Sequence, residues 1–111
     1  MLRGRQAEDQ AADYLARRGL TLVARNWRCK GGELDLIMRD GAVLVFVEVR
    51  ARGRRDFGGA GESITAVKQA RLIHAAQAYL ATLPRPPACR FDALLLDGDR
   101  LEWIRDAFQA D

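Results

Sequence analysis

The sequence predicts an α/β fold in which a mixed central sheet is flanked by helices. Two stretches repeat apolar residues at intervals of three and four, which is typical of helices. Between and after them lie apolar, β-rich runs typical of strands, and two Asp-Gly pairs mark tight turns. The order is helix, three strands, helix, strand, strand. A chain of 111 residues can bury one core but is too short for two, so residues 1–111 are expected to form a single domain.

The first helix is predicted over residues 5–18. Steps of three and four place one set of residues on a common face: Ala7, Glu8, Ala11, Ala12 and Leu15. Gly19 is a suitable C-terminal stop, because glycine readily adopts the backbone conformation that ends a helix. Residues 20–27 are then expected to form a strand, and Lys30-Gly31-Gly32 to turn the chain into a hairpin.

Acidic residues stand out in that hairpin. With Asp40-Gly41 as the two loop residues, Glu33 would face Glu48 and Asp35 would face Phe46. Side chains alternate along a strand, so Glu33, Asp35, Glu48 and Arg50 would project from one face. Like charges that face each other destabilise a sheet, and burial adds to the cost unless a cation or a proton intervenes. A divalent-metal site needs such an arrangement, whereas a fold does not.

The strand after the turn, residues 42–49, is a near-continuous apolar run. This pattern is expected of a central strand that is covered on both faces. Residues 51–61 break the pattern with four glycines among arginines, which predicts a loop. Thr65 can then cap the next helix.

The second helix is predicted over residues 66–82 and ends before the prolines that begin at Pro84. Its buried stripe is expected to contain Val67, Ala70, Ile73, Ala76, Leu80 and Leu83. Residues 90–96 are predicted to form a strand, and Asp97-Gly98 a second tight turn into a last strand at 101–104.

Composition narrows the class of protein. The net charge is +3, which by itself does not imply nucleic acid. No apolar run approaches the ~20 residues of a membrane span, and the first residues lack the apolar region of a signal peptide, so a cytoplasmic protein is expected.

Cys29 and Cys89 lack metal-binding spacing and are expected to be free thiols. His74, the single histidine, is expected on a helix surface or half-buried, which argues against Ser-His-Asp and Cys-His chemistry.

Carboxylates on two adjacent strands form a natural oxygen-donor site for Mg²⁺ or Mn²⁺. Such an ion polarises a phosphoryl oxygen and lowers the pKa of a bound water. Arg50, two residues beyond Glu48, shares their predicted face and could hold a phosphate. The arginines that follow could track a nucleic-acid backbone by neutralising its charge.

An acid at Asp35, and a second at Glu48 with a cation two positions on, resemble the motif of the PD-(D/E)xK nuclease superfamily. The predicted element order also resembles its restriction-endonuclease-like αβββαβ core. More closely, the chain is similar to the YraN family of uncharacterised small bacterial proteins, themselves similar to Holliday-junction resolvases. The stretches that carry this resemblance are Gly4, Ala7-Glu8, Ala24-Arg25-Asn26-Trp27-Arg28, Gly32-Glu33-Leu34-Asp35-Leu36-Ile37, Val45-Phe46-Val47-Glu48-Val49-Arg50, Lys68-Gln69, Arg90-Phe91-Asp92 and Trp103-Ile104-Arg105-Asp106-Ala107-Phe108.

The resemblance implies that Asp35 and Glu48 are the main metal ligands and that the Val49 carbonyl could add an oxygen. It also matches Glu8 to an acid on the first helix of the resolvases, although a first-turn acid favoured by the helix dipole is an equal alternative. Glu33 is either a ligand or a rim acid paired with Arg28 or Lys30.

Position 50 departs from the superfamily motif, which usually ends in lysine. Arg50 stays protonated and cannot accept a proton, but it can orient a phosphate or stabilise a transition state. Lys68, near the start of the second helix, would supply the missing ammonium if that end faces the metal, and is otherwise a solvated lysine. The resemblance thus makes Glu8, Asp35, Glu48, Arg50 and Lys68 the candidate catalytic residues.

Candidate nucleic-acid contacts lie mainly in the glycine-rich loop. They are Arg52, Arg54, Arg55 and Phe57, together with Lys30. The alternative for the arginines is a solvated loop. Trp27 is expected to pack in or beside the core, and Asp92, inside an apolar strand near Arg90, to form a structural ion pair or a cap.

Three functions therefore compete. The first is a Mg²⁺- or Mn²⁺-dependent, nuclease-like protein that hydrolyses DNA, with branched or junction DNA as the substrate that the resemblance implies. The second is a nucleic-acid-binding module that keeps the fold but lacks efficient catalysis, because Arg50 replaces lysine. The third is a protein-interaction domain whose carboxylates pair with arginines. Analogy with junction resolvases, which cut two strands symmetrically, also suggests a homodimer.

Overall fold

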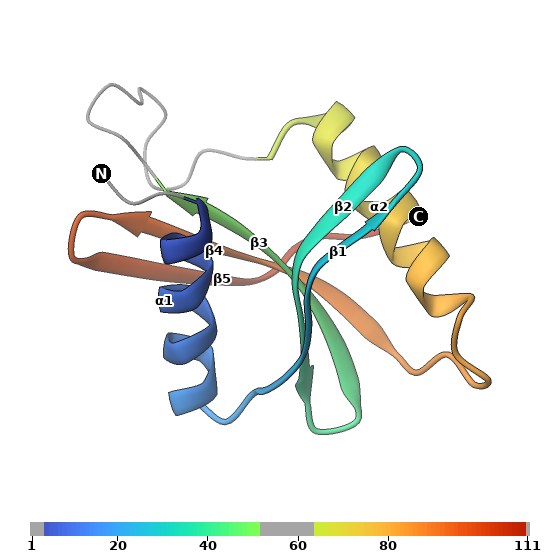
Figure 1. Ribbon diagram of the computed structural model, residues 1–111, viewed down its shortest axis with the longest axis horizontal. Helices are drawn as coiled ribbons and strands as arrows, with labels where there is room; N and C mark the ends of the chain where they lie inside the picture. Colours follow the sequence, from blue (N-terminus) through green and yellow to red (C-terminus); the bar gives the residue numbers. More distant parts are fainter. Residues whose placement is uncertain (1–3, 52–63, 111) are drawn as a thin grey trace.

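The α/β class and the element order predicted from the sequence are confirmed in the computed structural model (Figure 1). The structure describes residues 4–51 and 64–110. Its elements are α1 (Gly4–Arg17), β1 (Thr21–Cys29), β2 (Gly32–Asp40), β3 (Val43–Ala51), α2 (Ala66–Leu80), β4 (Cys89–Asp97) and β5 (Arg100–Phe108). Within these residues no helix is long and apolar enough to cross a membrane.

The five strands form one mixed sheet in the order β1-β2-β3-β4-β5. Neighbouring strands are antiparallel except β3 and β4, which are parallel. A parallel pair needs a crossover connection, and α2 lies in the connection between these two strands. The arrangement is compatible with the αβββαβ core of restriction-endonuclease-like proteins, and β3 occupies the central position that its apolar sequence predicts.

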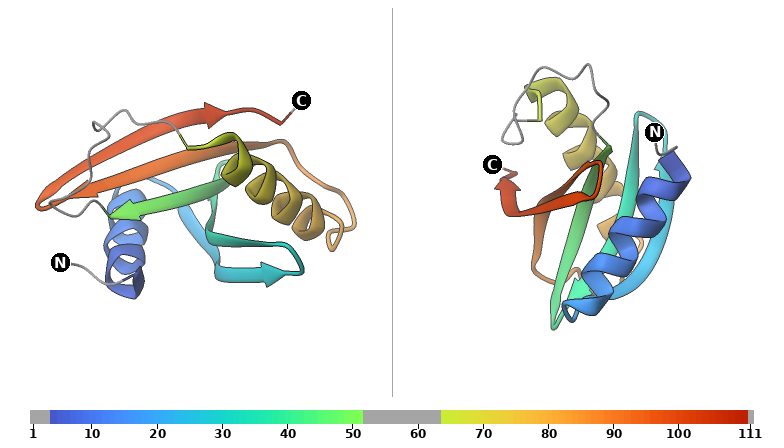
Figure 2. Two further views of the ribbon diagram at one scale, coloured as in Figure 1. Left: turned by 90° about the horizontal axis from the view of Figure 1, so that it is seen from above. Right: turned by 90° about the vertical axis from the view of Figure 1, so that its left-hand side faces the viewer.

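The central strand separates two hydrophobic clusters. Leu44 and Phe46 belong to the cluster that contains Leu72 and Ala75 of α2. Val45 and Val47 belong to the cluster that contains Leu15 of α1. The two helices therefore cover opposite faces of the twisted sheet (Figure 2). Because β3 is buried on both sides, its run of apolar residues needs no alternation.

Helix α1 follows its predicted pattern. Ala7, Ala11 and Leu15 are buried, whereas Glu8 on the same side is half-buried. Gly19 ends this helix as predicted, with a φ of +98° that favours glycine.

Helix α2 begins at the predicted cap, where the Lys68 N–H donates to Thr65 Oγ1 at 3.2 Å. The predicted buried stripe is wrong in its first turns, because Val67 is 63% exposed and Ala70 is exposed. The rest of the stripe is confirmed, because Ala76 is buried and Ile73, Leu80 and Leu83 pack against the core. The other buried residues of the helix are Leu72 and Ala75. This helix carries apolar residues around much of its circumference, so its spacing permitted more than one buried face.

Both predicted tight turns exist, but each is displaced by one residue. Asp40 pairs with Val43, so Gly41 and Ala42 are the loop residues. Only the first of these two has a positive φ, +62°, which is the pattern of a type II′ turn with glycine at its first central position. The same displacement occurs after β4, where Asp97 pairs with Arg100.

Asp92 is the buried polar centre of the last two strands. Its side chain is 0% exposed and accepts hydrogen bonds from Arg90 Nε at 3.0 Å, Trp103 Nε1 at 2.9 Å and the Asp106 N–H at 2.9 Å. Arg90 also reaches Asp40 Oδ2 at 2.9 Å. The predicted structural ion pair is therefore confirmed, and it joins β4 both to β5 and to the β2–β3 turn.

Candidate metal centre

Asp35 and Glu48 lie side by side at the ends of the paired parts of β2 and β3. The pairing of the two strands ends at Leu36 and Val47, and each acid is the next residue beyond that last pair, away from the turn. Beyond that point the Val49 N–H donates to Asp35 Oδ2 at 3.0 Å, and the Asp35 carboxyl group is close enough to Glu48 for the charge of Glu48 to act on it. The two main ligands implied by the resemblance are thus brought together.

Burial makes this pair electrostatically unusual. Glu48 is 4% exposed. Desolvation, together with the charge of Glu48, raises the pKa of Asp35 from 3.8 to about 7. Near neutral pH the pair therefore either keeps one proton or, when both groups are ionised, attracts a cation strongly.

The cation that the structure supplies comes from α2. Lys68 Nζ lies 2.8 Å from Glu48 Oε2, and the lysine side chain is 54% exposed. The structure thus favours the arrangement in which this end of the helix faces the acids, rather than a lysine surrounded by solvent. The Thr65 cap fixes where α2 starts.

Arg71 is the residue of this site that the sequence analysis missed. It lines the same cavity as Asp35, Glu48 and Lys68, one helical turn beyond the lysine. A signal existed in the sequence, because residues three apart on a helix share a face. It could be used only once Lys68 had been placed at the acids.

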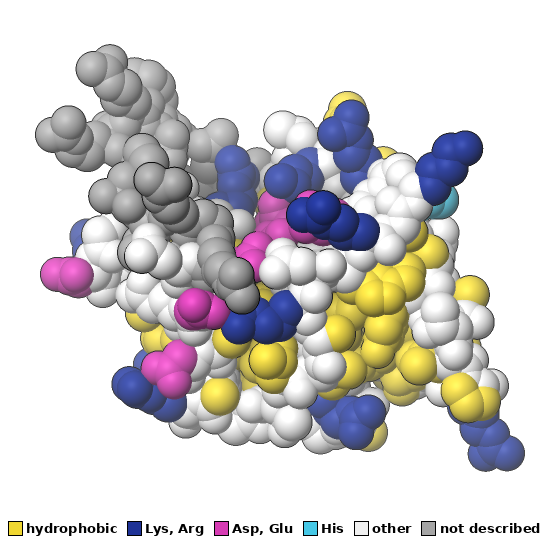
Figure 3. Space-filling view, viewed as in Figure 1, with side chains coloured by type: hydrophobic (Ala, Val, Ile, Leu, Met, Phe, Trp, Pro, Cys, Tyr) yellow, Lys and Arg dark blue, Asp and Glu magenta, His cyan; other side chains and the backbone are white. Residues whose placement is uncertain are grey.

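The cavity has a volume of about 450 Å³. The turn between β1 and β2 forms one wall and packs closely on α2. The contact is so close that a Cβ added at Gly32 would lie only 2.7 Å from the Arg71 backbone oxygen. His74 Nε2 lies 2.9 Å from the carbonyl oxygen of Lys30 in the same turn. Acidic side chains are visible beside several Lys and Arg side chains in Figure 3.

The predicted crowding of three acids requires a correction. Among the described residues, no group of three or more His, Cys, Asp or Glu side chains is placed to hold an ion. Asp35, and not Glu33, is the neighbour of Glu48, because the displaced turn moves the register by two residues. Glu33 also lines the cavity, but it accepts a hydrogen bond from Arg28 Nε at 3.2 Å. The alternative of a rim acid paired with Arg28 is therefore observed.

Three other candidates lie in different parts of the fold. Glu8 is half-buried on α1 and contributes to the raised pKa of Asp35 through its charge. Arg50 is half-buried and pairs with Leu95 of β4. Lys30 is exposed at the β1–β2 turn. Four predicted nucleic-acid contacts, Arg52, Arg54, Arg55 and Phe57, lie outside the described residues.

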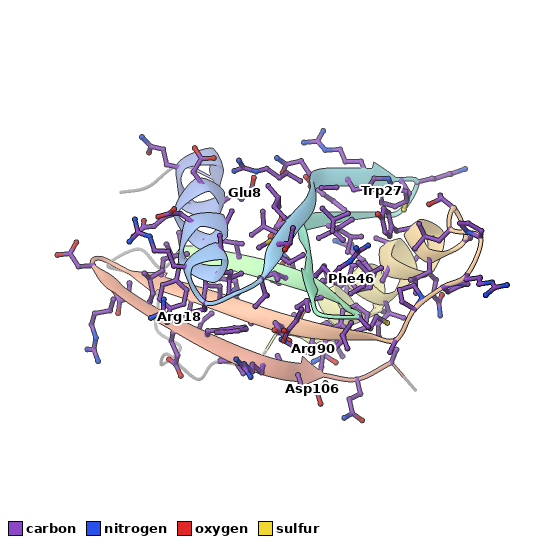
Figure 4. The ribbon with its side chains drawn as sticks, turned by 90° about the horizontal axis from the view of Figure 1, so that it is seen from below. Glu8, Arg18, Trp27, Phe46, Arg90 and Asp106 are labelled. Atoms are coloured by element: carbon purple, nitrogen blue, oxygen red, sulfur yellow. The ribbon has the colours of Figure 1, made fainter. Side chains whose placement is uncertain are left out.

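Trp27 and the cysteines follow their predictions. Trp27 packs edge-on against Tyr79 with ring centroids 5.4 Å apart, between the β1–β2 hairpin and α2 (Figure 4). It is therefore part of the packing rather than a free platform for bases. Cys29 and Cys89 are free thiols.

The chemistry of the donors fits Mg²⁺ or Mn²⁺. Both ions prefer carboxylate oxygens and retain several waters. Half-buried Asp35 and buried Glu48 present oxygens from two strands, and the raised pKa of Asp35 provides a proton that a cation could replace. Asp35 and Glu48 would hold the ion, and the Val49 carbonyl could assist. An ion held there would supply a polarised phosphoryl oxygen and a more acidic water.

The raised pKa of Asp35 predicts that the protein is less stable at pH 7 than at pH 4. The folded protein holds the Asp35 proton up to about pH 7, whereas the unfolded chain releases it near pH 3.8. The contribution of this proton to stability is therefore complete below pH 3.8 and is lost as the pH rises through about 7. Asp35→Asn should flatten this part of the profile and stabilise the protein at about pH 8. Urea unfolding across this range tests the prediction, with exposed Asp13→Asn as the control. A variant that keeps the wild-type slope would contradict it.

Comparison with known proteins places the site inside a recognised family. A model of the uncharacterised protein family UPF0102 matches residues 7–96, a range that contains Glu8, Asp35, Glu48 and Lys68. The chain is 62% identical over 110 residues to a UPF0102 protein of Dechloromonas aromatica, covering 98% of this chain and 90% of the relative. It is 61% identical over 111 residues to one from Cupriavidus taiwanensis, covering 98% and 84%, and 56% identical over 110 residues to one from Nitrosospira multiformis, covering 96% and 92%.

Proposed function

The chain belongs to the uncharacterised protein family UPF0102, which is the YraN family that its motifs resemble. From that premise we propose that it is a metal-dependent, nuclease-like protein that hydrolyses phosphodiester bonds in DNA. The observation that carries the proposal is the half-buried Asp35 beside the buried Glu48, with Lys68 Nζ 2.8 Å from Glu48 Oε2. Two acids and an ammonium group that open into one cavity are the residue types that metal-assisted phosphoryl chemistry uses.

Each residue has a distinct part in this proposal. Asp35 and Glu48 hold Mg²⁺ or Mn²⁺, which neutralises charge on the phosphoryl oxygens. Lys68, half exposed beside them, holds the attacking water or the phosphate in place by donating hydrogen bonds. Arg71, on the rim of the cavity, binds a neighbouring phosphate. Arg50 can orient a phosphate but cannot remove a proton from water.

The charge around the acids supports a polyanionic substrate. Arg28, Lys30, Lys68 and Arg71 belong to or border the cavity, and phosphate binding by such residues carries much of the affinity for nucleic acid. Branched or junction DNA, a homodimer and a cytoplasmic location are the finer parts of the proposal, and they rest on the resemblance to junction resolvases.

The direct test is incubation of the protein with end-labelled linear, flap and four-way-junction DNA in Mg²⁺ or Mn²⁺. We expect strand cleavage that EDTA abolishes, with a preference for the branched substrates. Asp35→Asn should remove the activity, whereas the exposed Asp13→Asn should retain it. Absence of cleavage by wild type with every substrate and both ions would refute the nuclease proposal.

Arg50 favours a second candidate, a nucleic-acid-binding module without efficient catalysis. Arginine stands where the superfamily motif usually has a lysine, and it stays protonated at any physiological pH. This candidate predicts salt-sensitive DNA binding that needs no metal and survives Asp35→Asn. Arg50→Lys would separate the two, since newly gained cleavage would identify position 50 as the defect. Absence of DNA binding at low salt would instead favour a protein-interaction domain.

Arg71→Ala should weaken DNA binding without changing its sequence preference, because a guanidinium on the rim contacts phosphate rather than bases. In a plot of log affinity against log salt concentration, the slope should become shallower by about 1. Fluorescence polarisation with labelled DNA in Ca²⁺ measures this without relying on cleavage. Arg100→Ala, at the exposed start of β5, is the matched control. Equal slopes for both variants would exclude a phosphate contact at Arg71.

A further inference from the structure

A second cavity lies at the other end of α2. Its volume is about 450 Å³. Its apolar walls come from Val23 of β1, Leu44 of β3, Tyr79 near the end of α2, and Leu83 just beyond it. Figure 3 shows hydrophobic side chains gathered on this part of the surface, with Lys or Arg side chains at the edges. We call this cavity the distal groove.

The distal groove carries positive charge and no acidic lining residue among those that the structure describes. Arg39 and Arg85 both line it and both are exposed. In the described part of the chain, neither guanidinium forms an ion pair with a carboxylate. Arg85 stands between Pro84 and Pro86, and proline restricts the backbone on both sides of it.

The β1 wall of the groove is formed by a bulge in an edge strand. Leu22 pairs with Met38 and Ala24 with Ile37, so Val23 is the extra residue. A bulge re-aims side chains and interrupts the ladder, and Val23 is 39% exposed and its neighbour Leu22 is 41% exposed. These are two of the three exposed large hydrophobic residues noted in the described part of the chain. The apolar wall is therefore available for contact.

We propose that the distal groove docks an extended acidic peptide segment of a partner protein, with one large apolar side chain seated between Arg39 and Arg85. The groove supplies apolar surface for that side chain, and each guanidinium can pair with a carboxylate in a two-pronged geometry. Apolar lining with two exposed cations is complementary to a segment in which acidic residues flank an apolar one.

The composition of the groove favours a peptide over nucleic acid. Single-stranded nucleic acid binds by stacking its bases on the faces of aromatic rings. Tyr79 is the single aromatic residue that the structure describes in the lining, and its ring already makes edge contacts with Trp27 and Phe46. The other apolar walls are aliphatic or proline side chains, which suit an aliphatic or aromatic side chain of a peptide.

The groove is separate from the acidic cavity. Tyr79 follows Lys68 by eleven residues on the same helix, which is ~16 Å along its axis. The inference therefore does not rest on the proposed nuclease function, and it would stand if no DNA were cleaved.

The test begins with selection of a phage-displayed library of random nonapeptides on the full-length protein. We expect the enriched peptides to carry Asp or Glu on both sides of a large apolar residue. Fluorescence polarisation with a synthetic copy of the most enriched peptide then measures its affinity. The double variant Arg39→Glu/Arg85→Glu should bind it at least about tenfold more weakly and should select peptides rich in Lys or Arg.

Controls separate the groove from general attraction of opposite charges. Arg100→Glu, on the exposed start of β5 far from α2 (Figure 1), should bind the peptide within about twofold of wild type. No enrichment, enriched peptides without acidic residues, or equal affinity for the double variant and wild type would overturn the proposal. Displacement of the peptide by an oligothymidine at low micromolar concentration would assign the groove to nucleic acid instead.

Discussion

Glu48→Gln should abolish metal-dependent DNA cleavage and lower the affinity for Mn²⁺ by at least about a hundredfold. Residues that merely support a metal ligand already cost 10- to 100-fold when they are changed, so loss of a charged ligand should exceed that range. Glutamine keeps the shape of the side chain but removes the charge that faces Lys68 Nζ at 2.8 Å. Calorimetric titration with Mn²⁺ and the junction-cleavage assay measure the two effects separately.

Glu33→Gln is the matched control for this experiment. It is the same substitution, at a residue that lines the same cavity but is exposed and paired with Arg28. We expect a change of a few-fold at most, since exposed ion pairs contribute little. A Glu48 variant that still binds Mn²⁺ and cleaves DNA would refute the proposed metal centre. An equally large loss at Glu33 would make it a third ligand, which is one of the two alternatives that the sequence left open.

Asp92→Ala should destabilise the protein by about 3–5 kcal/mol, the usual cost of breaking a buried charge pair. The change removes five hydrogen bonds that three residues donate to Asp92. It also leaves the Arg90 guanidinium, which is only 19% exposed, without its main partner. Hydrogen bonds that Arg90 donates to Asp92 raise the pKa of Arg90 in the wild type. Without Asp92 the guanidinium still keeps its proton, as arginine does in proteins, so its charge stays unpaired. Urea unfolding at neutral pH measures the loss.

The effect should depend on burial rather than on the loss of an acid. Asp13→Ala removes an ion pair with Arg17 whose side chains are 62% and 75% exposed, and we expect a change within about 0.5 kcal/mol. A loss below about 1 kcal/mol for Asp92→Ala would show that the site relaxes or admits water. The Asp106 N–H, on β5 (Figure 4), donates to Asp92. We therefore expect β5 to be the strand that the substitution destabilises most.

The proximity of Asp35 and Glu48 could be predicted from the sequence even though the predicted hairpin register was wrong. An Asp-Gly pair fits either at the centre of a type I′ turn or with glycine opening a type II′ turn, and the two placements differ by one residue along the chain. That displacement shifts the register by two, which keeps each side chain on its face. It changes only which acid lies beside Glu48, and the structure puts Asp35 there.

The positions of Lys68 and Arg71 could not be predicted in the same way. The sequence indicated a helix capped by Thr65, which the structure confirms, but it left two faces apolar enough to be buried. The face that is buried depends on the β1–β2 turn, where Gly32 packs against the Arg71 backbone. This long-range contact turns both cations toward the acids, and no local pattern encodes it.

By itself, the sequence determined the α/β class, the order of the elements, the central position of β3, the caps at Thr65 and Gly19, and the family. These features follow from local periodicity and turn chemistry, which act over a few residues along the chain. Only the tertiary structure decided that Glu33 pairs with Arg28, that Lys68 meets Glu48, and that two arginines border a second groove. Glu33 and Arg28 pair because the β1–β2 register sets them opposite each other. The other contacts join residues far apart in the chain, and packing of α2 against the twisted sheet brings those residues together.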